Sequence, residues 1–143
     1  MDEWNRFLEA NREQIRKYGS ISPAILLLRE NSQPTACILE GFDNGDKIVG
    51  AIMLLLEKVD PDSYIFSSLG WGTEFYEKVW SENPEYEQIV DMPLDDREEY
   101  YIQIEVIKPG YLSRSYMAAI NRDSVDIFYN EDNIAESKFI LHW

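Results

Sequence analysis

A strict alternation of side-chain character between residues 100 and 106 is the feature that most restricts how this chain can fold. One set of apolar side chains is interleaved with a second, mostly polar set: Tyr100, Ile102, Ile104 and Val106 alternate with Tyr101, Gln103 and Glu105. A two-residue period is that of a β-strand buried on one face. Pro109 and Gly110 follow and predict a turn, so we expect the chain to return as a second, antiparallel strand.

The turn also predicts the register of this hairpin. With Pro109 and Gly110 at its centre, four pairs lie opposite one another: Glu105 and Arg114, Gln103 and Tyr116, Ile102 and Met117, and Tyr100 and Ala119. Unlike charges meet in the first pair and apolar side chains meet in the last two, which favours that register. We therefore expect the first two pairs on one face of the sheet and the last two on the other.

Two longer helices are predicted from apolar residues at three- and four-residue spacings. The first runs from Trp4 to Tyr18 and stops at Gly19, and the second begins at the N-cap Asp46 and runs to Val59. Shorter segments bounded by turn residues predict the other elements, which are strands over 24–29, 35–42, 63–69, 125–129 and 138–143 and a third helix over 73–80.

The order of these elements predicts the fold class. The chain has 143 residues and no shift in composition along its length, so we expect residues 1–143 to form a single domain. The predicted order is a helix, a hairpin, a helix, a strand, a third helix and then an antiparallel meander of about four strands, which is typical of an α+β domain. We expect about three helices packed on one face of a mostly antiparallel sheet that ends in a C-terminal meander, with the other face left to water or to a partner.

The charge balance narrows the possible functions. The chain carries 27 Asp and Glu against 13 Lys and Arg, a net charge of -14, and it has one Cys and one His. An acidic surface repels phosphates and anionic lipids, so we expect neither direct nucleic-acid binding nor membrane binding. A Cys/His zinc site is excluded by composition, and no cofactor is expected. The charged N-terminal stretch and the single Cys37 favour the cytoplasm.

More than half of the net charge lies between Glu74 and Glu99. These 26 residues hold ten acids and two bases, a net of -8, whereas the other 117 residues hold a net of -6. Aromatic residues are interleaved with the acids, a combination suited to receiving Lys and Arg side chains of a partner. The predicted partner-binding residues are Trp71, Glu74, Tyr76, Glu77, Trp80, Glu82, Glu85, Tyr86 and Glu87. A solvated loop that keeps the protein soluble is the alternative interpretation.

Catalytic patterns are missing from the sequence. His142 lies in a predicted strand and Cys37 among apolar residues, and neither has a sequence neighbour that would activate it. The nucleophile-elbow, phosphate-loop, dinucleotide and H-E-x-x-H motifs do not occur. The acidic turns 43–46 and 130–133 lack the spacing of a calcium loop. The sequence therefore names no catalytic and no metal-binding residue, which favours a protein that is not an enzyme.

Three functions remain open. The first is a non-enzymatic acidic binding protein that docks a basic protein, as inhibitors, immunity-type proteins and mimics of nucleic acid do. The second is a small-ligand-binding protein or enzyme that uses a polar sheet face, made of Tyr101, Gln103, Glu105, Arg114 and Tyr116. The third is a homodimer or larger scaffold joined through apolar strand edges. We favour the first, because no motif in the sequence favours the second.

Overall fold

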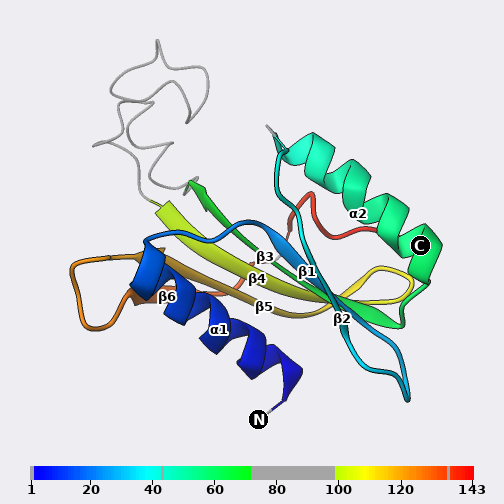
Figure 1. Cartoon of the computed structure of the whole chain (residues 1–143), viewed down its shortest axis with the longest axis horizontal. Helices are drawn as coiled ribbons and strands as arrows, with labels where there is room; N and C mark the ends of the chain where they lie inside the picture. The colour runs from blue at the N-terminus through cyan, green and yellow to red at the C-terminus, as the bar shows by residue number, and fades with distance from the viewer. Residues whose placement is uncertain (1, 43, 72–98, 135) are drawn as a thin grey trace.

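The computed structural model describes residues 2–42, 44–71, 99–134 and 136–143, which form an antiparallel sheet of six strands and two helices (Figure 1). The elements in chain order are α1 (Glu3–Tyr18), β1 (Ala24–Leu28), β2 (Thr35–Ile38), α2 (Gly45–Val59), β3 (Ser63–Trp71), β4 (Glu99–Ile107), β5 (Tyr111–Ile120) and β6 (Phe128–Asp132). The strand order across the sheet is β2-β1-β3-β4-β5-β6. The predicted α+β class with a mostly antiparallel sheet is confirmed.

The hairpin of β4 and β5 has the predicted register. Glu105 lies opposite Arg114 and Gln103 lies opposite Tyr116. The register shifts by one residue beyond Glu105, because the loop that joins Ile107 to Tyr111 holds three residues instead of two and a β-bulge absorbs the odd one. The two predicted pairs on the opposite face, those of residues 102 and 100, are also present.

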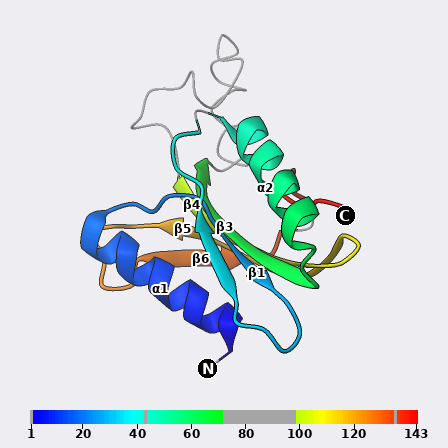
Figure 2. The same cartoon turned by 45° about the vertical axis from the view of Figure 1, so that its right-hand side comes forward.

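The two helices lie on opposite faces of the sheet, which corrects the prediction that the helices pack on one face (Figure 2). On one face, α2 buries Ile52 against a cluster that includes Phe66 and Ile104. On the other, α1 buries Leu8 and Ile15 against the far side of the same strands. The physical reason is visible in the central strands: β1 is apolar throughout, and residues 64–68 of β3 are buried on both faces of the sheet.

The remaining helix predictions have mixed outcomes. The predicted end of the first helix at Gly19 is confirmed, and this residue has a φ of 80° that favours glycine. The second helix begins two residues earlier than predicted, because the side chain of Asn44 caps it by accepting from the backbone N–H of Lys47 at 2.9 Å. The described residues hold two helices, and the third one predicted over 73–80 lies outside them.

The predicted final strand over 138–143 is wrong. The backbone of this segment bonds to side chains instead of to a strand: the hydroxyl of Tyr64 donates to the carbonyl of Phe139 at 2.6 Å and accepts from the N–H of Leu141 at 2.9 Å. The indole of Trp143 donates to the carbonyl of Pro61 at 2.9 Å. The segment thus closes the margin of the apolar core beside α2. The strand predicted over 125–129 begins later, at residue 128.

Candidate functional site

A connected set of buried polar side chains, the polar network, joins α1 to the centre of the sheet. The amide nitrogen of Asn11 donates to the hydroxyls of Ser67, at 3.0 Å, and of Tyr101, at 2.9 Å. The Tyr101 hydroxyl in turn donates to the side-chain oxygen of Gln103, whose amide nitrogen donates to the carbonyl of Trp4 at 3.1 Å. Every member is buried, and burial raises the pKa of Tyr101 above its ordinary value. The polar network therefore fixes the position of α1 on the sheet.

Arg114 stands at the border of this face, where α1 begins. Its Nε lies 3.1 Å from Glu105 Oε1 and its Nη1 lies 3.3 Å from Asp2 Oδ2, while the guanidinium carbon is 5.1 Å from the centre of the Trp4 ring. The hydrogen bond that Arg114 donates to the Glu105 carboxylate raises the pKa of Arg114. The carboxylate of Asp2 also caps α1 by accepting a hydrogen bond from the backbone N–H of Asn5, and this hydrogen bond lowers the pKa of Asp2. The cation is therefore paired with two carboxylates and lies over an aromatic ring.

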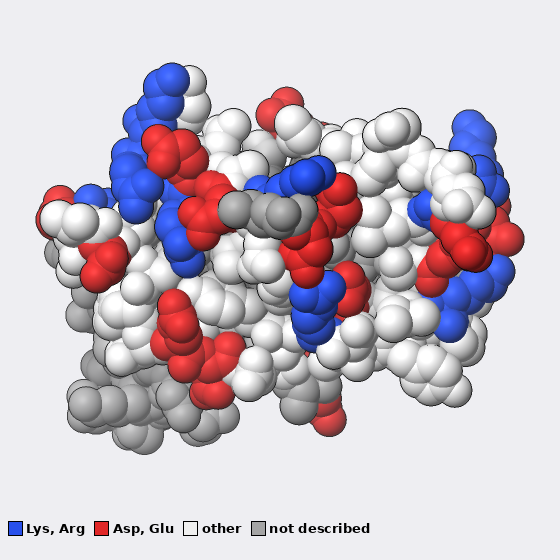
Figure 3. All heavy atoms as spheres, turned by 90° about the horizontal axis from the view of Figure 1, so that it is seen from below, with Lys and Arg blue, Asp and Glu red and all other residues white. Residues whose placement is uncertain are grey.

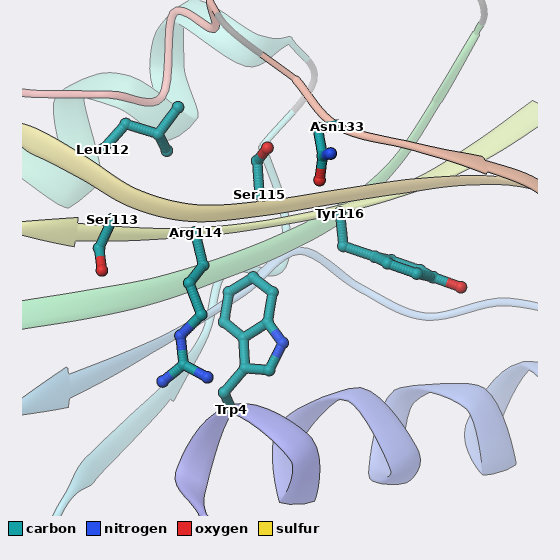
Figure 4. Close-up of a pocket in the computed structure, with 7 residues that line it drawn as sticks. All are labelled: Trp4, Leu112, Ser113, Arg114, Ser115, Tyr116 and Asn133. Atoms are coloured by element: carbon teal, nitrogen blue, oxygen red, sulfur yellow. The ribbon is translucent and has the colours of Figure 1, made fainter.

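A shallow hollow of about 490 Å³ opens beside Arg114 (Figure 4). Its lining comes from α1, β5 and the residue after β6: Trp4, Leu112, Ser113, Arg114, Ser115, Tyr116 and Asn133. The Tyr116 hydroxyl donates to Glu131 Oε1 at 2.9 Å, and burial together with that carboxylate raises its pKa to about 12. The strongest polar groups at the hollow thus already have protein partners, which leaves little hydrogen-bonding capacity for a ligand.

The structure separates the five residues of the predicted sheet-face site. Tyr101 and Gln103 are fully buried beneath α1, where they belong to the polar network. Glu105, Arg114 and Tyr116 lie at its border, and only the last two line the hollow. The sequence reasoning missed Asn11, the helix residue that closes this face. The signal was present, because Asn11 occupies the apolar stripe of α1 between Leu8 and Ile15.

Of the predicted partner-binding residues, all but Trp71 lie outside the described part of the chain. Trp71 is the last residue of β3, and its backbone pairs with Glu99 at the start of β4. Arg122 holds this end of the sheet in place, since its guanidinium bonds to Glu99 and donates to the carbonyl of Gly19 at 2.7 Å. The acidic segment 74–99 therefore leaves and re-enters the sheet at one fixed point between the two central strands.

On the exposed side of α1, acids are interspersed with bases. Figure 3 views the molecule from the side of α1, where red and blue side chains alternate. Three ion pairs follow the helix at i,i+3 spacing, and they are Glu3 with Arg6, Glu9 with Arg12, and Glu13 with Arg16. Such exposed pairs contribute little to stability, but they cancel the local field that would steer a charged partner.

The remaining candidate residues form no reactive centre within residues 2–42, 44–71, 99–134 and 136–143. Cys37 is a half-buried free thiol, and the imidazole of His142 lies against Gly110. No group of three His, Cys, Asp or Glu in these ranges is placed to hold a metal ion. Neither α1 nor α2 is long and apolar enough to cross a membrane.

Comparison of this chain with protein-family models, with curated proteins and with solved structures finds no match.

Proposed function

We propose that this protein is a non-enzymatic binding protein that docks a basic protein partner through its acidic aromatic segment. The role would be that of an inhibitor, an immunity-type protein or a mimic of nucleic acid, acting in the cytoplasm without a cofactor. The observation that carries the proposal is the segregation of charge: a net of -8 in the 26 residues from Glu74 to Glu99 against -6 in the other 117.

The residues at the two ends of the acidic segment support this proposal. Its flanking residues Trp71 and Glu99 face each other on the two central strands, and Arg122 anchors that end of the sheet. A segment tethered at both ends loses less freedom on binding than a free tail would. Three acids on α1 are paired with neighbouring bases, whereas residues 74–99 hold ten acids and two bases. Concentrated charge of one sign accelerates encounter with a partner of opposite sign.

The alternative of a ligand site on the sheet face receives weaker support. Tyr101 and Gln103 are covered by α1 and have hydrogen-bond partners within the protein. Arg114 is occupied by two carboxylates. An enzyme at this face would need α1 to move away and the polar network to break.

The experiment is capture of partners from the native cell lysate on immobilised protein, eluted with rising salt and identified by mass spectrometry. Three versions are compared: the wild type, a triple variant in the segment (Glu82→Lys, Glu85→Lys, Glu87→Lys), and a triple variant outside it (Glu30→Lys, Glu57→Lys, Glu136→Lys). Both variants change the net charge equally, and the outer set consists of exposed residues. The comparison therefore distinguishes an effect of where the negative charge lies from an effect of the total net charge on partner binding.

We expect one basic protein to be retained by the wild type and by the outer variant and lost from the segment variant, with elution at moderate salt. Equal loss from both variants would mean that only the total charge matters. Retention of no selective partner at low salt would leave the segment as a solubility feature and would contradict the proposal.

A further inference from the structure

The two edges of the sheet differ in chemistry. The edge strand β6 ends in Glu131 and Asp132, whose charges oppose pairing with another strand of this acidic chain. The other edge strand, β2, holds Thr35, Ala36, Cys37 and Ile38, and residues 31–39 around it carry no charge. Figure 2 shows β2, in cyan, in front of the other strands. Two copies of this acidic chain can therefore approach along β2 without bringing carboxylates together.

The backbone of β2 has hydrogen-bonding groups directed away from the sheet. Leu39 donates its N–H to the carbonyl of Pro23 at 2.7 Å, and Cys37 lies opposite Ile25. In an antiparallel pair the backbone groups of successive residues point to alternate sides. Because residues 37 and 39 point toward β1, the N–H and C=O groups of Ala36 and Ile38 point outward, at the edge of the sheet that the described residues build.

The side chains of β2 complement a second copy of the same strand. Ile38 has 66% of its surface exposed although it is a large apolar residue. Ala36 and Ile38 both border a largely apolar groove of about 260 Å³ between α1 and the β1–β2 hairpin, whose lining also includes Phe7, Ala10 and Glu40. One patch thus offers a protruding side chain and, two residues away, a small residue beside a groove. An interface with two-fold symmetry needs this self-complementarity.

We propose that a second copy of this chain pairs with β2 in antiparallel fashion and continues the sheet across a two-fold axis. The register that uses all four outward-facing groups within the strand pairs Ala36 with Ile38 of the second copy, and the reverse. Ile38 of each copy then lies beside Ala36 and the groove of the other. The same register places the two Cys37 residues opposite each other, at a position without hydrogen bonds between them, where Cα atoms are about 4.5 Å apart.

The oligomeric state is measured by sedimentation equilibrium of the full chain with reductant, from micromolar to millimolar concentration. We expect a reversible monomer–dimer equilibrium, which Ile38→Lys weakens roughly tenfold or more by removing the apolar contact. Ala36→Pro removes an outward N–H and no bond to β1, so it should also weaken the dimer.

The register is measured by oxidising the thiols with copper phenanthroline, since Cys37 is the only cysteine. Cα atoms at the proposed separation fit a disulfide, so the wild type should form a covalent dimer rapidly. The matched control carries Cys37→Ser with Leu54→Cys, which moves the thiol to a site on α2 where the native side chain is 66% exposed. It should cross-link much more slowly.

A monomer at every concentration would overturn the proposal. So would a dimer that survives both Ile38→Lys and Ala36→Pro, or cross-linking at residue 54 as fast as at Cys37. None of these outcomes depends on the acidic segment, so this proposal and the proposed function can fail separately.

Discussion

The two faces of the sheet are closed by helices of similar length but by different chemistry. The face beneath α2 is packed with apolar side chains such as Ile52 and Phe66, and its main polar group, the hydroxyl of Tyr64, lies at the C-terminal margin. The face beneath α1 has the polar network at its centre. Apolar packing is strong but tolerant of small shifts, whereas buried hydrogen bonds require one geometry. We infer that α2 contributes mainly stability and that the polar network fixes where α1 sits.

The largest expected effect comes from opening the apolar face. Ile52→Ala removes a fully buried side chain from the core beneath α2, which should lower the free energy of unfolding by about 2–5 kcal/mol. Urea denaturation measures this change. Leu54→Ala on the same helix is the control, since that side chain is largely exposed and its loss should cost no more than about 0.5 kcal/mol. Equal losses would mean that α2 does not pack as described.

Breaking the polar network should have the next largest effect. Tyr101→Phe removes one hydroxyl and leaves the buried oxygen of Gln103 without its donor, which should cost about 1–3 kcal/mol. The matched change Tyr111→Phe, at a residue that is 70% exposed, should be nearly neutral. Denaturation curves for the two variants give the comparison. If both were neutral, the polar network would not determine how α1 is held.

Alkaline pH should also act on the face beneath α1. Burial raises the pKa of Tyr101, so its stabilising contribution is complete below the ordinary tyrosine pKa of 10.0 and is lost as pH rises toward the folded value. Stability should fall by up to about 1.4 kcal/mol per pH unit for this group above pH 10. Unfolding measured from pH 8 upward should show a shallower decline for Tyr101→Phe than for the wild type. Parallel declines would contradict the burial of this hydroxyl.

The smallest effect is expected at the border of that face. Glu105→Gln removes one of the two carboxylates on Arg114, and because the guanidinium is partly exposed the loss should be about 1 kcal/mol or less. Added salt should reduce the difference between the variant and the wild type. Glu57→Gln, at an exposed residue of α2, controls for the change of charge alone. A loss of unfolding free energy as large as that of Ile52→Ala would show that the Glu105–Arg114 ion pair is part of the core.

The contrast between the faces also explains what the sequence could predict. The hairpin of β4 and β5 was predictable in detail because its alternation, turn and unlike charges at Glu105 and Arg114 are all local. The placement of the helices depends on contacts between residues far apart in the sequence. Its local sign was the uninterrupted apolar sequence of β1, which is typical of a strand buried on both faces. The C-terminal segment was misread because its apolar residues resemble a strand, whereas the hydroxyl of Tyr64 captures its backbone.

The candidate sites were less predictable than the fold. Tyr101 and Gln103 were expected on an open face because a two-residue period does not say what covers each side of a strand. Asn11 in an apolar stripe was the sign of a buried polar partner. The acidic segment was evident from composition alone, but composition carries no information on shape, so its function stays a proposal.

Amide hydrogen exchange of the two helices measures whether α1 closes its face of the sheet as permanently as α2 closes the other. We expect similar protection, within about tenfold, for the amides around Leu8 and Ile15 in α1 and around Ile52 in α2, because both helices leave the sheet only on global unfolding. Exchange in α1 faster by several orders of magnitude would show that it opens on its own. The sheet face of Tyr101 and Gln103 would then be accessible, and a ligand-binding function would displace the one proposed here.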